Sequence, residues 1–64
     1  MSRPVLLHRL KGGDRFTINE GDSTVYTYER HDGMYVYCTY WIDGETSHRE
    51  CHLLMSIEVW PRKD

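Results

Sequence analysis

The sequence lacks the features that mark several large functional classes. No apolar run approaches the roughly 20 residues of a membrane-spanning helix, and no signal-peptide pattern precedes the strand-forming part. The formal net charge of −2 gives no basic excess, so total charge does not favour generic nucleic-acid binding. We therefore expect a cytoplasmic protein without a membrane segment.

Helical periodicity, internal repeats, linkers and low-complexity segments are also missing. The turn around Gly12 and Gly13 lacks the GxxxxGK[ST] spacing of a phosphate loop. The acidic loop at residues 19–23 lacks the further spaced oxygen ligands of a calcium site. With 64 residues, the chain is expected to form one domain, residues 1–64, whose core is too small for a deep catalytic cleft.

Strand-forming residues dominate what is present. Tyr and Thr are frequent in residues 24–53, and Val and Trp occur among them; these residue types suit a pleated, half-buried surface. Asp32-Gly33 and Asp43-Gly44 divide this stretch and are typical of type I′ hairpin turns. Further short strands are expected at residues 15–18 and 56–60, and a short strand or an extended segment at residues 5–10. The sequence thus predicts an all-β fold, a small barrel of five or six short antiparallel strands, closed so that no edge is exposed.

Two faces follow from the alternation of side chains along the predicted meander. If both turns contain two residues, Tyr28 lies opposite Tyr37 and Cys38 lies opposite Arg49, and opposed residues share a face. The more aliphatic face, which includes Cys38 and Cys51, is predicted to be the core.

The opposite face is aromatic, with polar side chains along one flank. Its candidate binding residues are Tyr26, Tyr28, Arg30, Tyr35, Tyr37, Trp41, His48 and His52. The tyrosines and the tryptophan are predicted anchors, because such rings offer large, rigid contact area. Two alternatives stay open: a plain barrel exterior with cross-strand tyrosine pairs, or an inverted barrel in which this face is the core.

Cysteine and histidine residues suggest metal or nucleophile chemistry that the predicted geometry opposes. Zinc accepts both residue types, but His48 and His52 are predicted on one face and Cys38 and Cys51 on the other. We therefore predict two buried free thiols, no metal site and no cofactor. Glu50 between the histidines could complete an acid–base row, yet this row lies on an open sheet, so we predict no catalytic residues and no enzyme activity.

Three segments resemble small proteins of actinobacterial phages, of the mycobacteriophage type. They are residues 10–16 (LKGGDRF), 25–27 (VYT) and 32–38 (DGMYVYC), which are similar to an LKxGDRF … VYTV … DGMYxYC pattern. The resemblance covers roughly residues 10–38. It implies a phage origin and an SH3-like barrel, but no catalytic residues, because those proteins are mostly of unassigned function.

We predict a non-enzymatic phage accessory protein that binds a host or phage protein through the aromatic face, in the host cytoplasm. One alternative is a small barrel that binds single-stranded nucleic acid, with tyrosines stacking on bases and Arg30 near phosphates. The acidic residues around this face argue against it. The other alternative is a self-assembling structural protein whose aromatic face forms a homo-oligomer.

Overall fold

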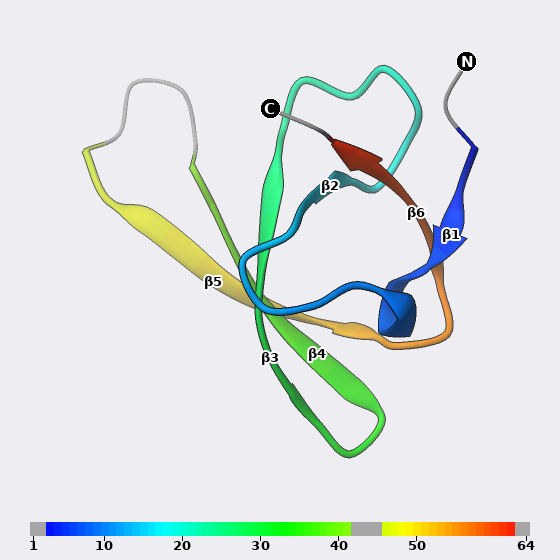
Figure 1. Cartoon of the computed structure of the whole chain (residues 1–64). Helices are drawn as coiled ribbons and strands as arrows, with labels where there is room; N and C mark the ends of the chain where they lie inside the picture. The colour runs from blue at the N-terminus through cyan, green and yellow to red at the C-terminus, as the bar shows by residue number, and fades with distance from the viewer. Residues whose placement is uncertain (1–2, 42–45, 63–64) are drawn as a thin grey trace.

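The computed structural model describes residues 3–41 and 46–62 and is an all-β fold (Figure 1). Its six strands are β1 (Val5–Leu6), β2 (Arg15–Thr17), β3 (Tyr26–Asp32), β4 (Tyr35–Trp41), β5 (His48–Leu54) and β6 (Glu58–Arg62), and the 3₁₀ turn η1 (Leu7–Arg9) follows β1. They form one antiparallel sheet in the order β1-β6-β2-β3-β4-β5. The prediction of an all-β fold is confirmed. Within the described residues, no helix has the length and apolar character needed to cross a membrane.

The sheet is bent but not closed into a barrel. Within residues 3–41 and 46–62, β1 pairs only with β6 and β5 pairs only with β4, so these two strands are its edges. Figure 1 shows β2, β6 and β1 curving together on one side, while the β3–β4 hairpin and β5 extend away from them. The expectation of a sheet without exposed edges is therefore wrong.

A small core fills the concave side of the bent sheet. Its buried residues come from η1 and four strands: Leu7, Phe16, Tyr28, Val36, Cys38 and Val59. The ring of Phe16 stacks on that of Tyr26, with 5.7 Å between the ring centroids. Each large apolar side chain buried here contributes about 1.5–3 kcal/mol, so the fold depends on segments from both ends of the chain.

The β3–β4 turn lies one residue further along than predicted. Asp32 pairs with Tyr35, so Gly33 and the residue after it form the turn, instead of Asp32 and Gly33. Gly33 has a φ of 61°, a left-handed conformation that glycine adopts without a steric penalty. Arg30 consequently pairs with Tyr37, and both side chains remain on the outer face, as predicted.

A β-bulge in β3 reverses the predicted faces of Tyr26 and Tyr28. The register shifts between Tyr28 and Arg30, which leaves Glu29 as the extra residue. Because of this shift, Tyr28 pairs with Cys38 and its side chain joins the core, where it is 8% exposed. The prediction that Tyr26 and Tyr28 lie on the outer aromatic face is therefore wrong.

The β4–β5 pairing is displaced by two residues from the prediction, which preserves the faces of both strands. Cys38 lies directly opposite Cys51, not diagonally, and Trp41 lies opposite His48. A shift by two keeps every side chain on its predicted side, because side chains alternate with a period of two. The predicted Asp43-Gly44 turn falls outside the described residues.

Candidate functional site

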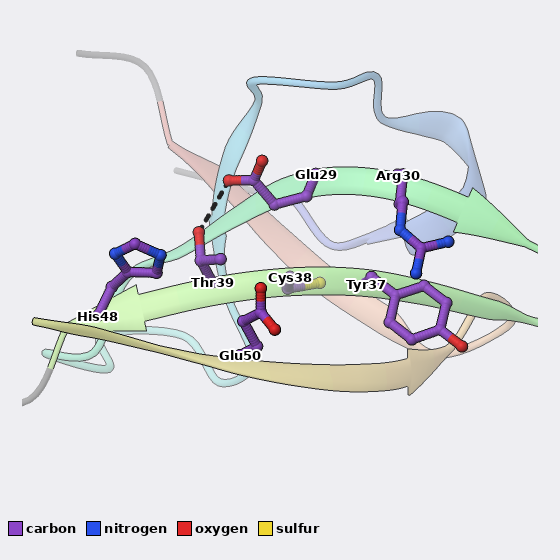
Figure 2. Close-up of a pocket in the computed structure, with 7 residues that line it drawn as sticks. All are labelled: Glu29, Arg30, Tyr37, Cys38, Thr39, His48 and Glu50. Atoms are coloured by element: carbon purple, nitrogen blue, oxygen red, sulfur yellow. Dashed lines mark hydrogen bonds between the residues drawn. The ribbon is translucent and has the colours of Figure 1, made fainter.

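A groove of about 460 Å³ crosses the outer face of β3, β4 and β5. Seven residues line it: Glu29, Arg30, Tyr37, Cys38, Thr39, His48 and Glu50. Figure 2 shows β4 along its floor, with side chains of β3 on one flank and of β5 on the other. Cys38 lies below the floor with a side chain only 1% exposed. Exposed acidic and basic side chains border the groove: Glu29, Glu50 and Arg30.

The bulge in β3 supplies one wall of the groove. It places Glu29 beside Arg30 on the outer side of the sheet, and the hydroxyl of Thr39 donates a hydrogen bond of 2.9 Å to Oε2 of Glu29. Glu50 stands on the other side of Thr39 (Figure 2). Two carboxylates thus flank the middle of the groove.

Sequence reasoning missed the role of Glu29, because regular alternation placed it on the core face. A carboxylate at a predicted core position of this strand is the signal in the sequence that indicates a bulge. The predicted outer positions of Thr39 and Glu50 are confirmed, although neither is among the predicted binding residues.

An arginine lies at one end of the groove, away from the two carboxylates. The guanidinium of Arg30 lies 4.0 Å from the centroid of the Tyr37 ring, and its Nη1 atom is 3.9 Å from Oδ2 of Asp32. Both charged side chains are largely exposed, so this ion pair contributes at most about 1 kcal/mol. The cation–π contact adds about 0.5–1 kcal/mol. Together these contacts hold the arginine over Tyr37, away from the carboxylates that flank Thr39 (Figure 2).

An aromatic row extends beyond both ends of the groove. His52 contacts Tyr35 and Tyr37, with ring centroids 5.1 Å and 6.1 Å away. At the far end Trp41 meets His48 edge-on, with 5.5 Å between the ring centroids. Trp41 is 59% exposed and Tyr35 is 41% exposed. These rings stiffen the sheet through cross-strand contacts and still present wide apolar surfaces to solvent.

The predicted binding residues therefore separate into two groups. The structure brings six together on the outer face: Arg30, Tyr35, Tyr37, Trp41, His48 and His52. Tyr26 belongs with the core, since its ring stacks on Phe16 and contacts Tyr40 with a centroid distance of 5.0 Å. Burial raises the pKa of the Tyr26 hydroxyl. The surface is smaller than predicted, and Tyr28 is likewise no part of it.

The two cysteines form a protected cross-strand pair. Both are free thiols. Burial raises the pKa of Cys38 to about 12, and burial also raises the pKa of Cys51. A thiol with a raised pKa is protonated at neutral pH and is a poor nucleophile. Within the part of the chain that the structure describes, no three His, Cys, Asp or Glu side chains are grouped to hold a metal ion.

Comparison of the chain with models of protein families, with curated proteins and with solved structures finds no match. The resemblance to phage proteins at residues 10–38 stays a prediction. The groove, its carboxylates and its aromatic row are therefore the features of the molecule that bear on its function.

Proposed function

We propose that the chain is a non-enzymatic protein-binding module, and that its groove and aromatic row take a basic segment of a protein partner. The observation that supports this proposal is the pair of carboxylates, Glu29 and Glu50, on either side of Thr39. Carboxylates attract the Lys and Arg side chains of a protein and disfavour partners of the same charge. An accessory role in a host cytoplasm, on a host or phage partner, is what the phage resemblance implies.

Aromatic anchors complete the proposed site. Trp41 and Tyr35 are exposed at the two ends of the groove, and Tyr37 lies between them. Tyrosine and tryptophan often dominate interface energetics because little conformational freedom is lost when they bind. A partner segment that follows the groove would contact these rings and place a basic side chain between the carboxylates.

Single-stranded nucleic acid fits this surface less well. Tyr26 and Tyr28 are occupied in the core, which leaves fewer rings for base stacking. Carboxylates in the middle of the groove would also repel a phosphate backbone.

Selection of random 12-residue peptides on the immobilised protein, followed by anisotropy titration, tests the proposal. We expect the selected peptides to be rich in Lys and Arg. Trp41→Ala, and Glu29→Gln combined with Glu50→Gln, should each weaken binding at least tenfold. Glu58→Gln is the matched control, because it removes an exposed carboxylate in β6 that does not line the groove.

Two outcomes would refute the proposed function. In the first, the selected peptides lack basic residues and bind equally well after both groove carboxylates are removed. The other is tight binding of a thymidine oligonucleotide that weakens steeply with salt, which is the behaviour of a phosphate-binding surface.

A further inference from the structure

The outer edge of β5 is open. In the described residues β5 pairs with β4 alone, and it has seven residues, whereas the opposite edge strand β1 has two. Figure 1 shows the N-terminal part of β5 on the side of the molecule away from β1 and β6, while its C-terminal end turns toward η1 and β6. An edge strand of this length presents a row of unpaired backbone groups, which pair readily with another strand.

The alternation of hydrogen-bonded pairs along β5, which we call its backbone phase, identifies the residues that direct backbone N–H and C=O groups to the open edge. Met55 N–H donates a hydrogen bond of 2.9 Å to the carbonyl of Met34, so Met55 directs its backbone N–H toward the β4 side of the strand. Hydrogen-bonded and non-hydrogen-bonded pairs alternate along an antiparallel ladder. Cys51, four residues before Met55, therefore also directs its backbone groups to β4. Glu50 and His52 direct theirs to the open edge.

We propose that two copies of the chain pair through their β5 strands, antiparallel, with Cys51 opposite Cys51 at a twofold axis. In a continuous sheet, opposed residues share a face, so only registers centred on a residue are allowed. Centring on Arg49 or on Glu50 would place like charges directly opposite each other. Centring on His52 would oppose the two His52 side chains and leave Glu50 against Leu54, so that no carboxylate would face a histidine. Centring on Cys51 places Glu50 opposite His52 of the second copy, and does so twice.

The backbone phase agrees with this register. Glu50 and His52 direct their backbone groups outward, so the two Glu50–His52 pairs become the hydrogen-bonded pairs of the new ladder. Cys51 then occupies a non-hydrogen-bonded position, where opposed Cα atoms are only about 4.5 Å apart. Every residue-centred register meets this backbone phase, so the charges select the register and the backbone geometry is compatible with it.

This pairing has a consequence for the outer face. A twofold axis perpendicular to the sheet leaves both grooves on the same side of one extended sheet. A dimer would thus present two grooves to a partner with two basic segments, which raises the effective affinity without new contacts. The pairing itself does not depend on what the groove binds.

Sedimentation equilibrium of the reduced chain, from about 10 μM to about 1 mM, tests the pairing. A short strand pair is a small interface, so we expect weak association within this range, with the mass rising from 7.7 kDa toward twice that value. A mass of one chain at every concentration would overturn the proposal.

Charge exchange tests the register. H52E places a second carboxylate opposite Glu50, and E50K removes the carboxylate that faces His52, so each should raise the dissociation constant of the dimer at least tenfold. The double variant E50K/H52E restores opposite charges and should return to within about threefold of the parent. E58K, away from β5, is the control for changed net charge. The proposed register is contradicted if the dissociation constant does not change in the single variants, or if the double variant does not recover it.

Oxidative crosslinking gives a second, geometric test. In Cys38→Ala protein, copper phenanthroline should oxidise two Cys51 thiols to one intermolecular disulfide, with two electrons passing to the oxidant and two protons to solvent. Cys51→Ser protein should stay uncrosslinked because Cys38 is buried. Circular dichroism verifies that both variants are folded. Absence of the crosslink in folded Cys38→Ala protein, at concentrations where it is dimeric, would overturn the Cys51-centred register.

Discussion

Single residues show how burial sets the chemistry of this chain. Cys38 and Cys51 are directly opposed, and the partly buried Cys51 faces a fully buried neighbour. Desolvation disfavours the thiolate, so the pKa of Cys38 rises to about 12. The unfolded chain has no such burial, and its cysteines ionise near pH 8.5. The folded state therefore retains a proton that the unfolded state releases.

That difference predicts a loss of stability at alkaline pH. The contribution of Cys38 is fully present below about pH 8.5 and is lost as pH rises toward its folded pKa, by at most about 1.4 kcal/mol per pH unit. Urea unfolding in reductant at pH 7 and pH 10 should show a loss about 2 kcal/mol larger in the parent than in Cys38→Ala. Equal losses in the two proteins would mean that Cys38 ionises normally in the folded state.

Among the elements, the β3–β4 hairpin decides which side chains reach the groove. The loop before β2 packs on β3 next to the bulge: Gly13 N–H donates to the carbonyl of Tyr28 at 2.7 Å, and Tyr28 N–H donates to the carbonyl of Asp14 at 2.8 Å. A Cβ added at Gly12 would lie 3.4 Å from the carbonyl oxygen of Glu29. Contacts from a distant loop thus accompany the bulge, and the bulge orients Glu29 outward.

The turn of the same hairpin yields a prediction about strain. Gly33 has a φ of 61°, and a Cβ there would meet no atom within 4 Å. Gly33→Ala should therefore destabilise the fold by about 1–2 kcal/mol through backbone strain alone. Gly33→Asn should cost less, because asparagine tolerates this conformation better. Chemical denaturation of both variants provides the measurement, and an alanine variant as stable as the parent would show that the turn adopts another conformation.

In the molecule as a whole, the two ends of the chain complete the core together. Val5 pairs with Val59 in the β1–β6 ladder, and Leu7 is fully buried behind it. Leu7 N–H donates to the carbonyl of Ile57 at 2.9 Å. The long β3–β4–β5 meander therefore does not stand alone; it depends on a lid made from residues near both ends.

Truncation tests this dependence. A chain that starts at residue 11 loses Leu7, and loss of a buried leucine alone costs about 2–5 kcal/mol, comparable to the whole stability expected of so small a domain. It should show no cooperative unfolding transition by circular dichroism. A chain that starts at residue 4 keeps the buried residues and should unfold like the parent. A folded, cooperative chain from residue 11 would show that the meander is stable alone.

The predictions from sequence that hold share one physical origin. The all-β class, the outer positions of Tyr35, Tyr37 and Trp41, and the core positions of Val36 and Cys38 all follow from residue type and alternation along single strands. Such information is local, and it tolerates a displacement of two residues between strands, because a period of two restores the same face.

Only the tertiary structure decided the rest. The bulge at Glu29 has no unique local pattern, yet it moved Tyr26 and Tyr28 into the core and created the acidic wall of the groove. Closure of the sheet likewise depends on how far its bent strands can approach one another, and β5 stayed an edge. Residue types thus determined which strands form, while long-range packing determined the register, the open edge and the groove.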